Sequence, residues 1–449
     1  PSFTGDTAMI SRKIISLAWP AICEMMLYMM LDIVDVAFVG RLGAESLAAV
    51  GLGGQIYFSV LFVFCALSAG ATALIARAVG AGDPERAGRT AGQALSLALI
   101  TGVLVTVSVY FFADAAVGLF HFDAEVRRLA VIYIRATGSA AAFGMVLFIS
   151  NGIFRGAGLT RIPFYVAGLT NAVNIAGDYI LIFGKCGLPA LGGRGAAIAT
   201  ASAQVVGCIV MLILLFSGAT LVRMRLQDLF RLNDWALTRV IVKLSVPAGL
   251  EEALFSLGRI VCSFMLSGLG TVPFAAHQIV NVAESLSYMP GYGFAVAATA
   301  LVGQNLGAHK PKQAYQHGMA ATRLALVVMG AIGLTFLFFP SAIIRIFTSD
   351  PQVIALGALC LRIAAFEQPS IALEMVLAGA LRGAGDTRTP ALVTVFSTWL
   401  LRIPCLYLAI YVFQWGLPAV WGIAVLDWTV RALLITIQYR RGKWQQIAL

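Results

Sequence analysis

This chain of 449 residues is poor in charge: Asp, Glu, Lys and Arg make up 12% of it, against about 25% in a typical soluble domain. Hydrophobic residues make up 60%, and the mean hydropathy is +0.89. There are only 4 histidines, and no pair among the 7 cysteines has metal-ligand or redox-motif spacing. The composition therefore argues against a water-soluble domain and against a cysteine-based metal or redox centre.

The common catalytic motifs are missing as well. The sequence contains no phosphate-binding loop, no His-Glu-x-x-His pair and no nucleophile elbow. Without an ATP-binding motif, any transport by this chain has to draw on an ion gradient or run downhill. We therefore expect no cofactor, and H⁺ or Na⁺ as the coupling ion if the chain is a transporter.

Apolar segments, in contrast, are abundant. Stretches of about 20 residues with few charges recur along the chain, and each is long enough to cross a hydrocarbon core about 30 Å thick. We predict twelve transmembrane helices, at residues 14–39, 48–76, 90–112, 127–154, 163–184, 195–221, 240–268, 274–304, 317–341, 353–381, 390–414 and 418–438.

The chain also repeats itself at one fixed offset, which we call the repeat offset. The run from Arg155 to Pro163 returns as Arg382 to Pro390, and the same offset carries Pro20 onto Pro247. Six spans in each half place both halves in the membrane with the same orientation. We predict an all-α membrane protein with two parallel-repeat six-helix bundles around a central cavity. The predicted divisions are an amino-terminal lobe, a cytoplasmic linker and a carboxyl-terminal lobe, at residues 1–220, 221–236 and 237–449.

Basic residues indicate the orientation, because cytoplasmic loops carry an excess of Lys and Arg. One side of the predicted membrane has 19 of them: Arg12, Lys13, Arg77, Arg86, Arg89, Arg155, Arg161, Arg223, Arg225, Arg231, Arg239, Lys243, Lys310, Lys312, Arg382, Arg388, Arg440, Arg441 and Lys443. The other side has 6: Arg41, Arg127, Arg128, Lys185, Arg194 and Arg345. We predict a multi-pass protein of the cell (inner) membrane with both termini in the cytoplasm. This asymmetry explains the net charge of +10 without a nucleic-acid partner.

Carboxyl groups inside predicted spans need a reason, because a charge at mid-bilayer costs several kcal/mol. The first span has acids and a tyrosine along one helical face: Glu24, Tyr28, Asp32 and Asp35. The fifth span has Asn171, Asn174 and Asp178 on one face. These groups either satisfy one another across a helix interface or bind a cation, since carboxylate and amide oxygens suit Na⁺ and a desolvated carboxylate can hold a proton.

The second half carries a different polar set. His277, Asn281 and Glu284 share one face of the eighth span, whereas the repeat offset carries Asp35 and Asp178 onto cysteines. We predict an ion pair within one helix for Asp427 and Arg431, four residues apart. Whether the second-half acids form a second ion site stays open: Glu251, Glu252, Glu284, Glu367 and Glu374.

Two further features are architectural. Gly152-x-x-x-Gly156 recurs as Gly379-x-x-x-Gly383, a spacing that favours close helix packing. Pro20 interrupts the first span, and we predict that it serves as a hinge.

Methionine is adaptable toward varied apolar ligands. The predicted substrate cavity is lined by Met25, Tyr28, Met29, Asp32, Glu252, His277, Asn281 and Glu284.

Taken together, these residues resemble the multidrug and toxic compound extrusion (MATE) transporters. The resemblance rests on the repeated Arg-Gly-x-Gly-x-Thr-Arg-x-Pro segments, on Val34 to Gly43 and on Ala275 to Ile279, and it covers essentially the whole chain. It is nearest to the prokaryotic branch that includes DNA-damage-inducible protein F. It implies a bending first helix, here the one containing Pro20, and a cation site in the amino-terminal lobe. The residues matching that site are Asp35, Asn151, Asn174, Asp178 and Thr200, with a possible Na⁺ at Asp35, Asn174 and Asp178.

The function expected from this resemblance is a cation-coupled antiporter that exports amphipathic or cationic drugs or toxins by alternating access. We expect it to work as a monomer in the lipid bilayer. One alternative is a flippase for lipid-linked saccharides, although the acidic face of the first span does not suit an anionic pyrophosphate. The other is an intramembrane enzyme with Asp35 and Asp178 as a catalytic pair, although no catalytic motif surrounds them.

Overall fold

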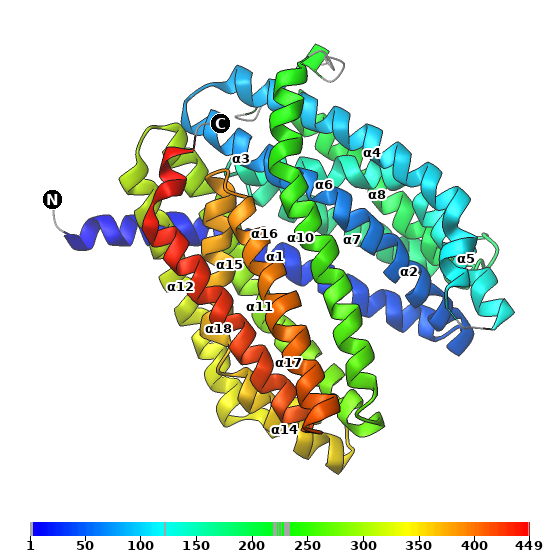
Figure 1. The fold of residues 1–449 in the computed structure, drawn as a ribbon. Helices are drawn as coiled ribbons and strands as arrows, with labels where there is room; N and C mark the ends of the chain where they lie inside the picture. Colours follow the sequence, from blue (N-terminus) through cyan, green and yellow to red (C-terminus); the bar gives the residue numbers. More distant parts are fainter. Residues whose placement is uncertain are drawn as a thin grey trace. The chain divides into compact units, whose positions relative to one another are not determined.

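The computed structural model of the chain describes residues 3–120, 123–218, 222, 224–225, 227–228, 234–447 and 449, with the side chains of residues 3–7 and Ala44 left aside. Within these ranges the backbone is helical and contains no strand (Figure 1). A chain this apolar has to satisfy its backbone hydrogen bonds internally, and helices do so. The predicted linker at 221–236 lies mostly outside the described residues.

The helices form two compact units. Unit 1 comprises the chain up to Ile22 together with Leu250–Leu449, and unit 2 comprises Cys23–Gly249. Helices wholly within unit 2 are α2 (Ala44–Cys65), α3 (Leu67–Gly80), α4 (Pro84–Gly118), α5 (Ala124–Gly138), α6 (Ala141–Gly156), α7 (Arg161–Phe183) and α8 (Gly193–Phe216). Asp83 begins α4 with an N-cap bond, accepting from the backbone N–H of Arg86 at 2.8 Å.

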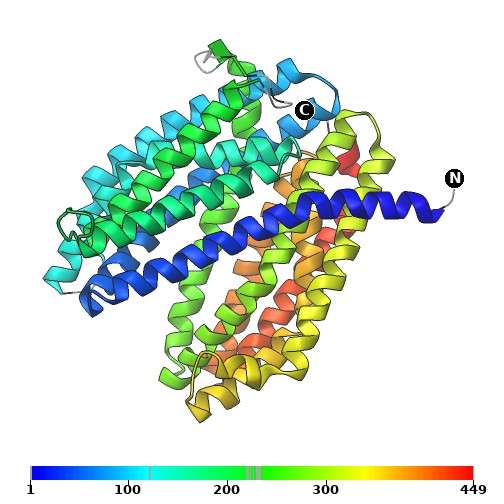
Figure 2. The same ribbon diagram turned by 180° about the vertical axis from the view of Figure 1, so that it is seen from behind.

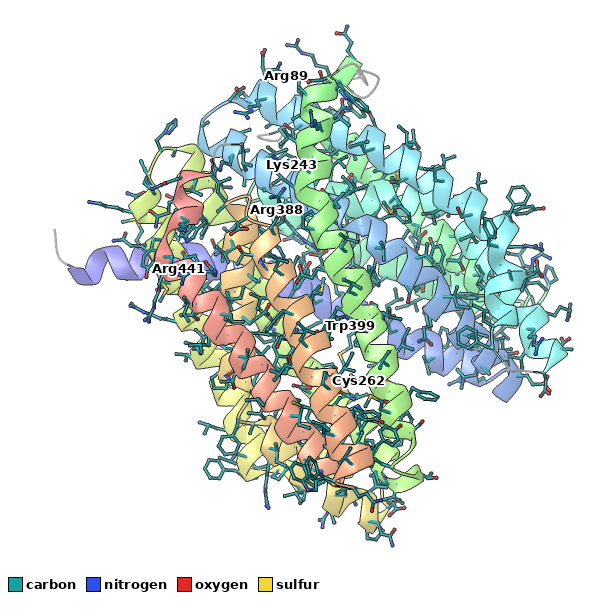
Figure 3. The ribbon with its side chains drawn as sticks, in the orientation of Figure 1. Arg89, Lys243, Cys262, Arg388, Trp399 and Arg441 are labelled. Carbon is teal, nitrogen blue, oxygen red and sulfur yellow. The ribbon has the colours of Figure 1, made fainter. Side chains whose placement is uncertain are left out.

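Unit 1 contains the equivalent helices of the second repeat. They are α11 (Thr271–Gly307), α12 (Pro311–Phe338), α13 (Pro340–Arg345), α14 (Pro351–Ala364), α15 (Gln368–Gly383), α16 (Arg388–Phe396), α17 (Ile403–Tyr407) and α18 (Leu417–Arg441). Two π-helical segments, η1 (Ser397–Arg402) and η2 (Leu408–Val412), extend α16 and α17, and a short 3₁₀ helix, η3 (Lys443–Gln446), follows α18. Arg388 and Arg441 lie at the same end of unit 1, and Cys262 lies farther along the helices (Figure 3).

Seven helical segments among the described residues are long and apolar enough to cross a membrane, or up to nine if each bent pair is one span. The bent pairs are α5 with α6, at 55°, and α14 with α15, at 51°. Three further helices, α1 (Phe3–Gly40), α10 (Trp235–Ser267) and α11, have 38, 33 and 37 residues. Each predicted span coincides with one of these helices, helix pairs or extended helices, and the predicted all-α membrane fold is confirmed.

Helices α1 and α10 each belong to both units. Helix α1 passes from unit 1 to unit 2 between Ile22 and Cys23, within one continuous helix (Figure 2). Helix α10 passes from unit 2 to unit 1 between Gly249 and Leu250, which are the equivalent positions in the second repeat. The beginning of the first helix of each repeat therefore packs with the helices of the other repeat.

Small residues bring these helices close together. A Cβ atom on Gly293 of α11 would lie 2.8 Å from the carbonyl oxygen of Ala18, inside unit 1. In unit 2, a Cβ atom on Gly70 would lie 2.6 Å from the carbonyl oxygen of Ile241, and Ser245 donates to the carbonyl of Leu67 at 3.1 Å. Glycine at these positions thus permits contacts between backbones that any side chain would block.

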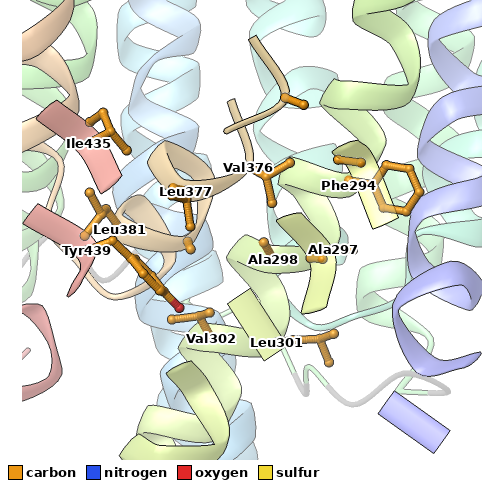
Figure 4. Close-up of a cluster of buried hydrophobic side chains, with 14 of the residues drawn as sticks. Phe294, Ala297, Ala298, Leu301, Val302, Val376, Leu377, Leu381, Ile435 and Tyr439 are labelled. Atoms are coloured by element: carbon orange, nitrogen blue, oxygen red, sulfur yellow. The ribbon is translucent and has the colours of Figure 1, made fainter. Parts of the chain in front are cut away.

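The core of unit 1 is built in the same way. Ile14 and Ala18 of α1 belong to one buried cluster with the helices of unit 1. Phe294, Leu301 and Leu377 are among its other members (Figure 4). The many alanines in this cluster keep the helices close, and the larger side chains fill the remaining space.

The predicted close packing at the repeated glycine motif is confirmed in both units. A Cβ atom on Gly156 would lie 2.6 Å from the carbonyl oxygen of Thr72, and Thr72 Oγ1 donates to the Gly152 carbonyl at 2.9 Å. The equivalent Thr299 Oγ1 donates to the Gly379 carbonyl at 2.8 Å. One glycine-threonine contact therefore holds α3 to α6 in unit 2 and α11 to α15 in unit 1.

Candidate cation site

Four polar side chains meet inside unit 2. Asp35 comes from α1, Asn174 and Asp178 come from α7, and Thr200 comes from α8. Asn174 and Asp178 are each 1% exposed, and Asp35 is half-buried. The sequence predicted this grouping from the resemblance, and the structure brings these four residues together.

Asn174 lies at the centre of the group. With its amide nitrogen toward the acids, it donates to Asp35 Oδ1 and to Asp178 Oδ2, both at 3.1 Å. Its amide oxygen then accepts from the backbone N–H of Thr200 at 3.1 Å and from Thr200 Oγ1 at 3.2 Å. This orientation is assigned from the network: a backbone N–H can only donate, so the amide oxygen has to face it.

The two carboxyl groups converge on one donor. The Asn174 amide nitrogen lies 3.1 Å from an oxygen of each acid. Two ionised carboxylates that converge in this way repel each other, and a proton on one of them or a cation beside them removes the repulsion. The remaining oxygen of Asp178, Oδ1, is buried and has no hydrogen-bond partner among the described residues. The site can therefore hold at least one proton, and it has spare oxygens that could face a small cation.

Local sequence explains why these side chains converge. Asn174 and Asp178 are four residues apart, so they share one face of α7. Gly177, between them, lets α8 approach, because a Cβ atom there would lie 2.9 Å from Ala199 Cβ. A Cβ atom on Gly195 would lie 2.7 Å from the backbone of Leu181. These two glycines bring Thr200 of α8 within reach of Asn174.

Apolar side chains enclose this polar group. Val39, Ile182 and Ala197 are buried in one cluster with Tyr133 of α5. The Tyr133 side chain is 6% exposed and packs within this cluster. Tyr133 is a residue that the sequence did not identify, because a tyrosine in an apolar span is usually core.

Three other predicted polar residues of this half have different surroundings. Asn151 is buried on α6, and the hydrogen bonds of the described residues include none between it and the four-residue group, so its role there stays a prediction. Asn171 donates to the carbonyl of Leu27 at 2.7 Å, which ties α7 to α1. Glu24 pairs with Arg155 at 2.6 Å, so it lies apart from Asp35 despite sharing its helical face.

The equivalent place in unit 1 holds arginine side chains. Asp35 and Asp178 correspond to Cys262 and Cys405, and Thr200 corresponds to Asp427. Arg431 Nη2 lies 2.8 Å from Asp427 Oδ2, which confirms the predicted pair within α18. Arg402 Nη1, at the end of η1, lies 3.6 Å from the same oxygen. Two guanidinium groups therefore neutralise this carboxylate, whereas the equivalent position in unit 2 is Thr200, beside Asn174 and two acids.

The predicted substrate-cavity residues come from both units. In unit 2, Asp32 is exposed on α1, and the predicted lining also includes Met25, Tyr28 and Met29, which are partly buried. In unit 1, His277 is buried against Trp421 and lies 2.8 Å from Asn281, which is exposed. Glu284 is buried and Glu252 is partly buried. That these eight residues line one cavity stays a prediction.

Comparison with known proteins identifies the family. The MatE family profile matches the chain twice, at residues 20–180 and 247–408, and the two matches begin one repeat offset apart. The chain belongs to the MatE family. It is thus a multi-pass membrane transporter, and the alternative of an intramembrane enzyme is wrong. The double match also coincides with the repeat read from the sequence.

Relatives of this MatE chain match it over nearly its whole length. The probable multidrug resistance protein NorM of Thermotoga maritima is 33% identical over 445 residues, which cover 98% of this chain and 94% of that one. The multidrug resistance protein PmpM of Pseudomonas aeruginosa is 28% identical, covering 96% of this chain and 91% of that protein. A solved structure of a multidrug resistance MATE transporter in an outward-facing conformation has 24% identity, 98% and 97% coverage and a TM-score of 0.90, and it shows the same fold.

Proposed function

We propose that this protein exports amphipathic or cationic compounds across the cell membrane in exchange for H⁺ or Na⁺, by alternating access. The relatives named as multidrug resistance proteins support the class of substrate. The observation that carries the coupling is the group of Asp35, Asn174, Asp178 and Thr200, because it is the place in unit 2 where two acids share one buried network.

The hydrogen bonds favour H⁺ as the coupling ion. Asn174 offers its amide nitrogen to both acids, and a proton on one acid would remove the repulsion between the two carboxylates. A bound Na⁺ needs oxygen ligands. The Asn174 amide would have to turn its oxygen toward the acids to supply one, and it would then lose its bond from the Thr200 N–H. The geometry therefore supports H⁺, and Na⁺ is the second candidate.

The same geometry suggests how the ion drives transport. With the proton bound, Asp35 of α1 is held against α7 through Asp178 and Asn174. When the proton leaves, two negative charges repel each other at this contact, and the pairing of α1 with α7 weakens. A substrate that binds better when the proton is absent would then be released when a proton returns, as reciprocal coupling between two ligands requires.

The experiment is transport into proteoliposomes. The purified protein is reconstituted with an imposed pH gradient, an imposed Na⁺ gradient or neither, and uptake of a fluorescent lipophilic cation such as ethidium is followed. We expect uptake to follow the pH gradient and to stop when an ionophore dissipates it. Uptake that ignores both gradients would contradict the proposed antiport.

Two variants separate coupling from general damage. Asp35→Asn removes the charge that the coupling ion neutralises, so it should abolish gradient-driven uptake while expression stays intact. Glu45→Gln changes an exposed acid in the first turn of α2 and is the matched control. Full gradient-driven uptake by Asp35→Asn would show that Asp35 is not the coupling acid.

A further inference from the structure

One buried ion pair occurs twice in the molecule, at equivalent places. In unit 2, Glu24 Oε1 of α1 lies 2.6 Å from Arg155 Nη2 of α6. In unit 1, Glu251 Oε1 of α10 lies 2.8 Å from Arg382 Nη2 of α15. Both pairs join residues 131 apart in the chain, and the repeat offset carries the first pair onto the second. We call them the first and the second anchor pair.

The position of each anchor pair in its helix is informative. Helix α1 leaves unit 1 at Ile22, and Glu24 is the second residue of its segment in unit 2. Helix α10 leaves unit 2 at Gly249, and Glu251 is the second residue of its segment in unit 1. Each glutamate also follows a proline of the helix by four residues, Pro20 in α1 and Pro247 in α10. An anchor pair thus stands directly after each point where a helix passes between units.

The segments before these points are packed tightly on the other unit. Ala18 of α1 is 1% exposed within the core of unit 1. In α10, Ser245 bonds the carbonyl of Leu67 in unit 2. Between packed segment and anchor pair lies the proline, which lacks an N–H and so removes one bond of the helical ladder. Helix α1 therefore packs on unit 1 up to Ile22 and on unit 2 from Cys23, and helix α10 packs on unit 2 up to Gly249 and on unit 1 from Leu250, two residues after each proline.

The anchor pairs are built to stay closed. Glu24 is fully buried, and its carboxylate also accepts from the Tyr28 hydroxyl at 3.5 Å. Glu251 is 9% exposed and also accepts from Thr394 Oγ1 at 2.9 Å. Opening the first pair would leave an uncompensated charge out of contact with water, which is strongly unfavourable, whereas Arg382 of the second pair keeps a side chain that is 32% exposed. A contact of this kind holds two helices together while other contacts change.

From these observations we propose that Glu24–Arg155 and Glu251–Arg382 are positioning residues for transport. They fix the segments of α1 and α10 that begin at Cys23 and Leu250, so that a bend of either helix falls before its glutamate, in the turn that contains Pro20 or Pro247. The first pair also fixes the α1 segment that carries Asp35, eleven residues further along. This inference rests on the proposed function, because it concerns how a change at Asp35 is passed to the rest of α1.

The two pairs should differ in strength. Side-chain exposure is 10% for Arg155 and 0% for Glu24, whereas it is 32% for Arg382 and 11% for Glu251. Water can compensate a broken second pair better than a broken first pair. We therefore expect a larger loss of transport from variants of the first pair.

The test uses single variants and a charge exchange in the full-length protein. Glu24→Gln and Arg155→Gln should each lower the maximal rate of gradient-driven ethidium uptake at least tenfold, with ethidium binding within threefold of the wild type. The exchanged protein, Glu24→Arg with Arg155→Glu, should regain most of the lost rate. Arg155→Lys, which keeps the charge, should be milder than Arg155→Gln. Glu251→Gln and Arg382→Gln should show the same pattern with smaller losses.

The matched control is an exposed ion pair of similar length. Arg128 Nη2 lies 2.6 Å from Glu125 Oε1, with side chains 62% and 48% exposed, so Glu125→Gln should leave transport unchanged.

Wild-type rates from Glu24→Gln and Arg155→Gln would overturn the inference. So would an exchanged protein that folds and binds ethidium but transports no better than the single variants. Should the first-pair variants fail to fold, the test uses the second pair instead. The single variant is then Arg382→Gln, and the exchanged protein carries Glu251→Arg together with Arg382→Glu. A wild type that ignores both gradients would instead overturn the proposed function.

Discussion

The carboxyl groups of Asp35 of α1 and Asp178 of α7 share one donor, the Asn174 amide nitrogen, which lies 3.1 Å from an oxygen of each. These acids lie far apart in the sequence, on helices that unit 2 packs side by side. Because two carboxylates that share one donor repel each other, we assign them one shared coupling proton. This pair of acids is the basis of the predictions on coupling.

The first prediction concerns the two acids together. Asp35→Asn and Asp178→Asn should each abolish proton-driven uptake, and the double variant should be no worse than either, because the residues share one proton. The measurement is the initial uptake rate in proteoliposomes with a fixed pH gradient. Losses that add on a logarithmic scale would mean that the acids act independently.

The second prediction concerns Thr200. Thr200→Val removes the hydroxyl that orients the Asn174 amide but keeps the backbone N–H. Losing one such hydrogen bond typically costs about 0.5–1.5 kcal/mol. We expect the proton concentration for half-maximal uptake to rise by about 2- to 10-fold. Thr200→Ser keeps the hydroxyl and should resemble the wild type; equal effects from Ser and Val would assign the change to packing.

The third prediction tests the glycine contacts. Gly156→Ala places a Cβ atom 2.6 Å from the Thr72 carbonyl, so it should lower the stability of the purified protein by about 1–3 kcal/mol. Gly51→Ala is the control: it is an exposed position in α2 with nothing within 4 Å, and it should be neutral or slightly stabilising. Thermal unfolding in detergent measures both. A Gly156→Ala protein as stable as the control would contradict the close packing of α3 on α6.

The fourth prediction concerns the carboxylate that unit 1 has in place of Thr200. Asp427 is fully buried between Arg431 and Arg402, so Asp427→Asn leaves buried positive charge uncompensated and should cost about 3–5 kcal/mol. Asp114→Asn breaks an exposed pair with Arg135 and should cost about 0–1 kcal/mol. The comparison again uses thermal unfolding. A mild effect of Asp427→Asn would contradict the claim that Asp427 compensates the buried charges of Arg431 and Arg402.

The sequence alone predicts much of this fold. Hydropathy locates the spans, since a helix that crosses lipid has to be long and apolar. The repeat offset predicts which positions are equivalent, and the Gly152 and Gly379 motifs predict the contacts with Thr72 and Thr299. What hydropathy cannot predict is which helices become neighbours. The sharing of α1 and α10 between units is therefore visible only in the structure.

The candidate site was only partly predictable. The spacing of Asn174 and Asp178 places them on one face, but their meeting with Asp35 depends on packing between helices far apart in sequence. Glu24 shows the limit of reading one helix: its spacing grouped it with Asp35, whereas it pairs with Arg155. A signal was present, because Glu24 and Arg155 both recur in the second repeat, and residues that keep a joint pattern across a repeat can be partners.

The most direct test of the central claim is proton release on substrate binding. The purified protein in weakly buffered detergent solution is titrated with ethidium while the solution pH is recorded. If the proton shared by Asp35 and Asp178 competes with substrate, the wild type should release protons in proportion to bound ethidium, and Asp35→Asn should bind ethidium without releasing any. Ethidium binding by the wild type with no proton release, or with equal release by Asp35→Asn, would contradict the account.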